Sequence, residues 1–265
     1  MKSYIFRCKT HEAYIIKNLI ELLQNNIKTG CFEISDEGIK LQMMDANKRI
    51  LFKIELESKK FYNYLYVDKV NTLYIGINLN HLYKLLRSIK KKDSLHLFIL
   101  ENDMSNLGIE IIPKEKTHPV TTSYIKIQNI QNLEIILPNG YEHELLISSC
   151  GFSKMCKDMV LISNVMVVTL YEQHVVFSCN IGNVYSKEIS LGDPEYENDD
   201  TKQKLYIEEF DTEIFSRLTK LSALHQNLFI NFCIDLPLLI KCNIGNLGEF
   251  TMCIKSRKQI LENNQ

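Results

Sequence analysis

The feature that most constrains how this chain can fold is a weak internal repeat. Residues 14–45 have the pattern of a helix, a strand, a tight turn and a second strand, and residues 149–180 follow the same order. Residues 78–99 and 211–233 form a second matching pair, each with the pattern of a helix followed by a strand. Self-similarity on this scale indicates two copies of one structural unit, so the repeat predicts two similar domains.

The elements inside each half follow from hydrophobic periodicity. Alternation of apolar and polar residues predicts about sixteen short strands. Apolar residues spaced three and four apart predict four amphipathic helices, near residues 11–26, 79–90, 151–159 and 212–221. The predicted fold class is α+β, with two similar domains that each pack two helices on antiparallel β-sheet. The expected order is an N-terminal domain over residues 1–127, a linker over 128–139 and a C-terminal domain over 140–265.

Composition and motifs exclude several classes of protein. The eight cysteines include no C-x-x-C pair and the seven histidines show no metal-ligand spacing, so we expect free thiols and no metal site. Motifs of nucleotide, dinucleotide, serine-hydrolase and zinc-protease sites do not occur, which predicts a protein that is not an enzyme and uses no cofactor. Asn-Ile-Gly-Asn occurs at residues 180–183 and 243–246, and each copy is typical of a hairpin turn. No apolar stretch is long enough to span a membrane, so we expect an intracellular protein without a membrane partner.

Charge is segregated along the chain although the total is close to neutral, with 31 basic and 32 acidic residues. The predicted helices carry nine of the basic residues on faces away from their apolar stripes, and the rest of the chain then has ten more carboxylates than cations. Parallel cationic helix faces could contact the phosphates of duplex DNA without reading a base, although amphipathic helices also expose lysine without any such role. The candidate DNA-facing residues are Lys17, Gln24, Lys28, Lys84, Arg87, Lys91, Lys154, Lys157, Arg217 and Lys220.

Four segments match a known pattern in their order and spacing over nearly the whole chain. They are GIKLQMMDANKRILFKIEL (38–56), IGINLNHLYKLLRSIKKKDSLHL (75–97), CGFSKMCKDMVLISNVMVV (150–168) and DLPLLIKCNIGNLGEFTMCIK (235–255). In that order they resemble the central signature, the second helix with its following strand, the start of the second domain and the C-terminal signature of one family. That family is the DNA sliding clamps of the proliferating cell nuclear antigen type.

The resemblance implies a DNA clamp fold and a DNA polymerase processivity factor. Three chains would close into a homotrimeric ring that encircles double-stranded DNA, with helices lining the hole and sheets outside. Such a clamp tethers DNA polymerase and other replication and repair proteins, and it needs a separate clamp loader to open the ring. Most of the candidate residues fall where the family has DNA-facing positions, and Lys28 and Arg217 are added from periodicity alone.

The resemblance also implies two protein-binding sites. An edge strand near 123–127 would pair with one near 175–180 of a neighbouring chain, through Tyr124, Ile125, Ile127, Val175, Phe177 and Cys179. A pocket for PIP-box-type peptides of replication proteins would be formed by Met44, Leu51, Ile135, Leu137, Pro237 and Cys253. The chain departs from the family here, since Cys253, Lys255 and Ser256 replace a common tyrosine and a small residue before proline. Such divergence suggests a large DNA virus or another fast-evolving lineage, with function in the nucleus or in a viral replication compartment.

An alternative reading keeps the fold and changes the mode of action. A clamp-fold subunit could act as a monomer, a dimer or a member of a hetero-ring, in damage signalling or transcription, and could bind DNA by direct electrostatic attraction. Direct binding to short linear duplex should weaken steeply with salt, whereas a closed ring barely binds such DNA. The sequence leaves both readings open.

Overall fold

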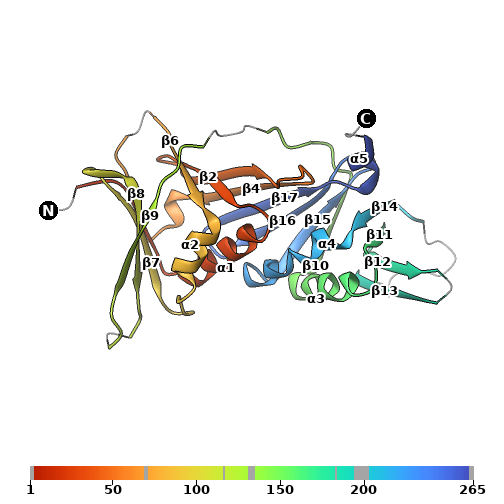
Figure 1. The fold of residues 1–265 in the computed structure, drawn as a ribbon. Helices are drawn as coiled ribbons and strands as arrows, with labels where there is room; N and C mark the ends of the chain where they lie inside the picture. The colour runs from red at the N-terminus through yellow and green to blue at the C-terminus, as the bar shows by residue number, and fades with distance from the viewer. Residues whose placement is uncertain are drawn as a thin grey trace. The chain divides into compact units, whose positions relative to one another are not determined.

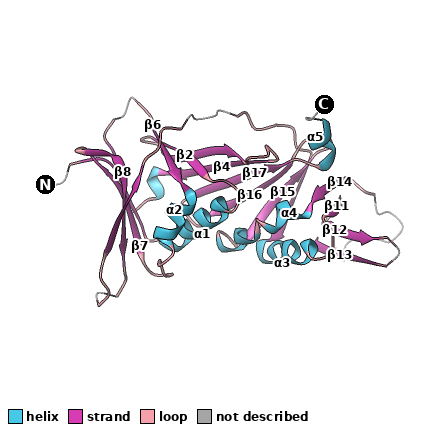
Figure 2. Ribbon diagram, viewed as in Figure 1, coloured by secondary structure: helices cyan, strands magenta, loops and turns pink. Residues whose placement is uncertain are grey.

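A computed structural model of the chain describes residues 3–68, 71–115, 117–130, 135–182, 184–193 and 203–262 (Figures 1 and 2). The helices are α1 (Ala13–Gln24), α2 (Leu79–Leu86), α3 (Ser149–Val160), α4 (Thr212–Ser216) and α5 (Arg257–Glu262), with 3₁₀-helices η1 (Ser58–Lys60) and η4 (Thr219–Ala223). The strands are β1 (Tyr4–Thr10), β2 (Thr29–Ile34), β3 (Gly38–Met44), β4 (Ile50–Glu57), β5 (Asn63–Tyr66), β6 (Leu73–Asn78), β7 (Ser94–Leu100), β8 (Asp103–Ile112), β9 (Thr121–Lys126), β10 (His143–Ser148), β11 (Val165–Leu170), β12 (His174–Ile181), β13 (Tyr185–Gly192), β14 (Tyr206–Asp211), β15 (Asn227–Phe232), β16 (Leu238–Ile244) and β17 (Gly248–Ile254).

The first compact unit packs helices α1 and α2 against antiparallel strands. It comprises the chain up to Ala46, Phe52–Ile135 and Asn243–Phe250. Five strands form a sheet in the order β5-β1-β7-β8-β9, and β6, β2, β3 and β4 are neighbours in another. The two helices contact each other, and α1 buries its apolar residues at helical spacing, among them Ile16, Leu19 and Leu23.

The second compact unit repeats this plan with α3, α4 and η4. It comprises Asn47–Leu51, Ile136–Cys242 and the chain from Thr251. Four strands form a sheet in the order β13-β12-β11-β14, and β10, β15, β16 and β17 are neighbours in another. Helix α3 contacts both α4 and η4. The predicted pairing of two helices with antiparallel sheet is therefore present in each unit.

Each unit also takes in a short segment from the other half of the chain. In the first unit the backbone N–H of Glu57 donates to the carbonyl of Leu247 at 3.0 Å. Gly248 permits the close approach, because a Cβ there would lie 1.9 Å from the carbonyl oxygen of Glu55. In the second unit the N–H of Lys255 donates to the carbonyl of Arg49 at 3.0 Å. The compact units are thus not simple consecutive stretches of sequence.

Helix α1 is two residues shorter at each end than the predicted span of 11–26, and two other predicted helices differ more from the structure. Helix α2 ends at Leu86 instead of residue 90, with Arg87 as its C-cap, and the Asp93 carboxylate accepts the N–H of Lys90 at 2.8 Å in the turn that follows. The predicted helix over 212–221 is divided into α4 and the 3₁₀-helix η4. From Phe215 to Leu224 the buried residues recur every third position, which is the period of a 3₁₀-helix and not of an α-helix. They are Phe215, Leu218, Leu221 and Leu224.

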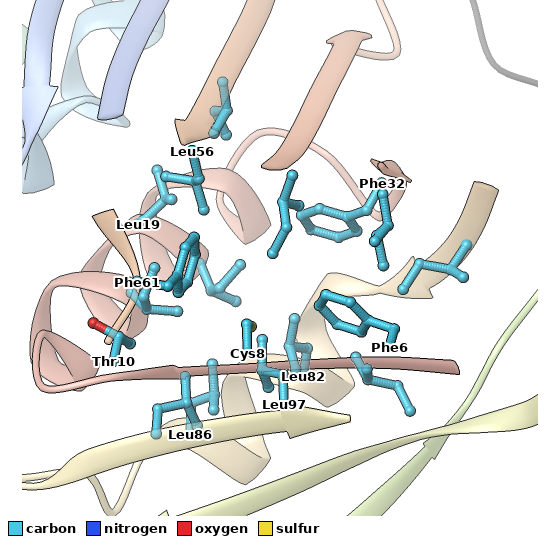
Figure 3. Close-up of a pocket in the computed structure, with 18 residues that line it drawn as sticks. Phe6, Cys8, Thr10, Leu19, Phe32, Leu56, Phe61, Leu82, Leu86 and Leu97 are labelled. Atoms are coloured by element: carbon cyan, nitrogen blue, oxygen red, sulfur yellow. The ribbon is translucent and has the colours of Figure 1, made fainter. Parts of the chain in front are cut away.

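The core of the first unit contains an apolar cavity of about 60 Å³ (Figure 3). Side chains from α1, α2 and the facing strands line it, among them Leu19, Leu82 and Phe6. The Cys8 thiol and the Thr10 side chain also lie in the wall, and burial raises the pKa of Cys8 far above that of a free thiol. A cavity with walls of this kind stays free of water.

We predict that Leu19→Ala lowers the free energy of unfolding by about 3–5 kcal/mol, because the new void joins the existing cavity and the surrounding side chains cannot close both. Leu19 is 2% exposed, whereas Leu161 is 82% exposed and provides the same substitution without a cavity. Leu161→Ala should change stability by no more than about 0.5 kcal/mol. Urea unfolding of both variants measures the difference, and a cost below about 1 kcal/mol for Leu19→Ala would contradict a rigid cavity.

Candidate nucleic-acid interface

The exposed face of α2 carries predicted cations. Leu79, Leu82 and Leu86 are buried, and Lys84 lies exposed on the opposite face. Arg87 caps the C-terminal end of the helix and is exposed as well. Lys91 is exposed in the turn before β7, beyond the end of the helix on which it was predicted. Lys84 and Arg87 therefore lie at the C-terminal end of a helix, where positive charge is favourable.

The predicted residues of the α1 region differ in their contacts and in their position relative to the helix. The Lys17 ammonium donates to the carbonyl of Ile89 at 2.8 Å and lies 4.2 Å from the centre of the Tyr14 ring. Gln24 ends the helix, and its side-chain amide donates to that of Asn25 at 3.1 Å. Lys28 is exposed, but it follows the helix instead of extending its face. Lys17 therefore ties α1 to the segment after α2, and its charge is already partly engaged.

Helix α3 presents two exposed lysines in the second unit. Phe152, Met155 and Met159 are buried, while Lys154 and Lys157 face solvent. The neighbouring carboxylate of Asp158 does not neutralise them directly, because it pairs with Lys187 of β13 at 3.0 Å. Two cations on adjacent turns are thus available to an external anion.

The remaining two predicted cations are less accessible. Arg217 is half-buried and forms an ion pair with Glu213, one turn earlier in α4. Lys220 lies half-buried in η4. Because this segment is not one continuous helix, these residues do not form the helical stripe that the periodicity predicts.

One predicted subunit edge is an edge of its sheet, and the other is not. Strand β9, with Tyr124 and Ile125, forms hydrogen bonds to β8 on one side and ends its sheet. Ile127 follows it, and its N–H donates to the carbonyl of Ser105. Strand β12 is paired on both sides, with β11 and β13, so the prediction of an edge at residues 175–180 is wrong. The side chains assigned to that edge are in the core: Val175, Phe177 and Cys179.

The edge strands of this second sheet are β13, next to β12, and β14. The register of β13 with β12 places Lys187 opposite Cys179 and Ile189 opposite Phe177. Sequence reasoning missed this strand, although the turn predicted at residues 180–183 required a partner strand immediately after it. Ser186, Glu188 and Ser190 alternate with the half-buried residues and are exposed. A polar, charged strand of this kind is typical of a sheet edge.

Of the residues predicted for a peptide pocket, Met44 and Ile135 belong to the first unit and the other four to the second. In the first unit, Met44 ends β3 half-buried, and the side chain of Gln42 donates to the carbonyl of half-buried Ile135. The N–H of Gln128 donates to the carbonyl of Gly76 at 2.8 Å and thereby fixes the start of the linker. Residues 131–134 of the predicted linker lie outside the described residues.

In the second unit, a tyrosine that the sequence did not single out joins two of the predicted residues. The Tyr141 hydroxyl donates to the carbonyl of Pro237 at 2.8 Å and lies near the thiol of Cys253. Burial raises the pKa of Cys253 to about 11, so the thiol stays protonated and unreactive near neutral pH. Leu51 is buried and Leu137 is half-buried. Tyrosine is common in protein-binding pockets because its ring is apolar and its hydroxyl is polar. The presence of Tyr141 in the sequence was therefore a signal for this site.

The described residues show no cluster of three or more histidine, cysteine, aspartate or glutamate side chains that could hold a metal ion. Among the same residues, no helix has both the length and the apolar character of a membrane span.

Comparison with known proteins identifies the family. The model "Proliferating cell nuclear antigen, N-terminal domain" matches residues 5–134, and "Proliferating cell nuclear antigen, C-terminal domain" matches residues 136–257. "Uncharacterized protein 436R" of Invertebrate iridescent virus 6 is 28% identical over 250 residues, 88% of this chain and 81% of the relative. "Probable DNA polymerase sliding clamp 1" of Paramecium bursaria Chlorella virus 1 is 24% identical over 95% of this chain and 97% of the relative.

A third relative is cellular. "Proliferating cell nuclear antigen" of Dictyostelium discoideum is 23% identical over 92% of this chain and 96% of the relative. The two family models together cover nearly the whole chain, and each matches one repeat of two helices packed on antiparallel sheet. The chain therefore belongs to the proliferating cell nuclear antigen family of DNA sliding clamps and has the two-domain DNA clamp fold.

Proposed function

We propose that this chain is a DNA polymerase processivity factor, one subunit of a homotrimeric ring that encircles duplex DNA. The main support for this proposal is that the helices of both units expose cations, above all Lys84, Arg87, Lys154 and Lys157. Within the described part of the chain, none of these four forms an ion pair with a carboxylate. They can therefore exchange their counterions for DNA phosphates.

The chemistry of these contacts fits sliding better than fixed binding. Lysine ammonium groups on flexible stems contact phosphates as point charges and do not require one geometry. Phosphate contacts position a protein on DNA without reading its sequence. A surface of this kind holds the duplex equally well at each base pair, so movement along it changes the interaction energy little. The protein itself would then be non-enzymatic, and topology would keep it on the DNA.

The two open sheet edges provide a route to ring closure. Strand β9 ends the five-stranded sheet of the first unit, and β13 is one open edge of the four-stranded sheet of the second. Antiparallel pairing of β9 with β13 of a neighbouring chain would continue one sheet into the other. This head-to-tail contact uses two different surfaces, so it generates a closed ring when the rotation between chains is a third of a turn.

The proposed partners follow from this function. A clamp loader, with its own nucleotide site, would open the ring, and DNA polymerase would bind through a PIP-box-type peptide. The candidate docking residues near Tyr141, Pro237 and Cys253 combine apolar surface with a fixed hydroxyl, which suits an apolar and aromatic peptide plug. We place the protein where replicating DNA is found, in the nucleus or in a viral replication compartment.

We predict that Lys84→Glu combined with Arg87→Glu shortens processive synthesis and speeds loss of the clamp from circular DNA. The substitutions replace two attractive contacts per chain with repulsive ones, while both side chains are exposed and contribute little to packing. Primer extension with a limiting amount of polymerase measures the product length. The matched control is Lys59→Glu with Lys60→Glu, an exposed pair in η1 of the same unit. Equal product length for all three proteins, at equal melting temperature, would argue against DNA contact by α2.

We also predict that Ile189→Asp lowers the solution mass from three protomers to one. The substitution places a carboxylate beside the proposed β13 contact, where burial of the charge opposes association. Ile207→Asp on β14, the other edge of the same sheet, is the matched control and should leave the trimer intact. Light scattering measures the mass, and circular dichroism checks that each variant is folded. A wild-type mass of one protomer would favour the alternative of a monomeric DNA-binding subunit.

A further inference from the structure

The five-stranded sheet of the first unit has a second face, which points away from the helices. Figure 1 shows α1 and α2 on one side of strands β7, β8 and β9. Alternate residues of these strands, such as Leu107, Ile109 and Ile125, are buried on the helix side. The register of the strands aligns one row of outward residues across all five of them: Leu65, Arg7, Phe98, Gly108 and Tyr124.

Aromatic rings cover the centre of this outward face. The Phe98 ring makes edge contacts with Tyr4 at 5.8 Å and with Tyr124 at 6.1 Å between ring centres. His96 lies 5.0 Å from Phe98, measured in the same way. Gly108 makes this arrangement possible, since a Cβ there would lie 2.3 Å from the Phe98 ring. Phe98 is 2% exposed but Tyr124 is 52% exposed, so Tyr124 presents the accessible ring of this cluster.

The same face has cations without opposing carboxylates. Arg7, Lys9 and Lys126 form no ion pair within the described residues, and the buried Nε of Arg7 has no hydrogen-bond partner among them. The guanidinium carbon of Arg7 lies 5.5 Å from the centre of the Tyr4 ring. The carboxylate in the adjacent row, Glu110, is engaged by His96 at 3.0 Å. An aromatic sheet face is therefore bordered by cations that form no ion pair within the described chain.

We propose that this outward face binds a single-stranded nucleic acid. Proteins that hold single strands without sequence preference combine cations for the phosphates with exposed rings on which bases stack. Here Arg7 and Lys9 lie two residues apart on β1, about 7 Å along the strand, and Tyr124 lies three strands away, about 14 Å across the sheet. Phosphates contact Arg7, Lys9 and Lys126, and a base stacks on Tyr124. The ring proposed above uses the helical side for duplex DNA and the backbone edge of β9 for a neighbouring chain. The Tyr124 side chain, which the sequence assigned to that subunit contact, projects instead from the outward face of the sheet, so this site is a separate one.

Fluorescence anisotropy with a labelled oligo(dT) of about twelve nucleotides at low salt tests the proposal. Arg7→Gln combined with Lys9→Gln should weaken binding about tenfold or more, through loss of two phosphate contacts. Tyr124→Leu keeps apolar bulk but removes the stacking surface, and should weaken binding about fivefold or more. Labelled oligo(U) of the same length shows whether the site takes RNA as well as DNA. Lys59→Gln with Lys60→Gln removes the same charge from η1 of the same unit and should leave binding unchanged.

Three results would overturn the proposal. The first is unchanged oligonucleotide binding in both variants of the sheet face. The second is loss of binding in Lys84→Glu with Arg87→Glu but not in Arg7→Gln with Lys9→Gln, which would assign the strand to the helix surface. The third is equally tight binding of polyglutamate that Tyr124→Leu does not affect, which would indicate an acidic peptide as ligand.

Folding and ring formation are monitored separately from this binding. The melting temperature of each variant shows that it is folded, and Lys126→Gln tests an exposed cation if the half-buried Arg7 proves necessary for folding. A short linear strand can leave a ring at its ends, so its affinity does not depend on topology. A chain that fails to form trimers but binds oligo(dT) through Arg7 and Tyr124 would contradict the proposed clamp and support this site.

Discussion

Burial of one apolar stripe on each helix is the interaction on which the cationic surface depends. In α3 the buried Phe152, Met155 and Met159 fix the rotation of the helix about its axis. Lys154 and Lys157 therefore point to solvent. The same holds for Lys84 in α2. These lysines need no internal partner to hold their position, because packing on the other side of the helix does so. Surface charge and core packing are thus separable, and the charge can change at little cost in stability.

The sequence predicted this surface where the hydrophobic period is regular and failed where it is not. The stripes of α1, α2 and α3 repeat at three and four residues, so their buried faces could be found without a structure. Residues 215–224 bury every third side chain, and the continuous helix predicted there is instead a short α-helix and a 3₁₀-turn. Lys28 and Lys91 were placed on helices that end before them. The ends of these helices are set by the few residues around their C-caps, Asn25 after α1 and Arg87 after α2, and these residues are too few to outweigh periodicity in a prediction.

Sheet edges were harder to predict because strand order is a non-local property. Alternation in residues 174–181 shows that Val175 and Phe177 share one face, but it does not show whether β12 has one neighbour or two. The polar residues of β13, among them Glu188 and Ser190, conceal its strand pattern, and they are also what protects an open edge from unspecific pairing. The exchange of residues 47–51 and 243–250 between the compact units is a second non-local feature that no local pattern reveals. Two similar domains with two helices each could be predicted from the repeat, whereas their edges and exact composition could not.

The cations of the helix surface fall into two classes, those that contact another group of the chain and those that form no such contact. This division bears on how a clamp can hold DNA and still move. Lys17 is fixed by the carbonyl of Ile89, and Arg217 is fixed by Glu213. Arginine with a set direction is the side chain best suited to bidentate, oriented contact with a phosphate, and such contacts favour one register over its neighbours. On α3 the unengaged cations are lysines, whose ammonium groups can follow a phosphate as it moves. Of the four exposed, unpaired cations of the proposed interface, three are lysines and one is Arg87. Such a surface suits the proposed function, because counterion release attracts a duplex and mobile charge keeps the energy nearly flat along its axis.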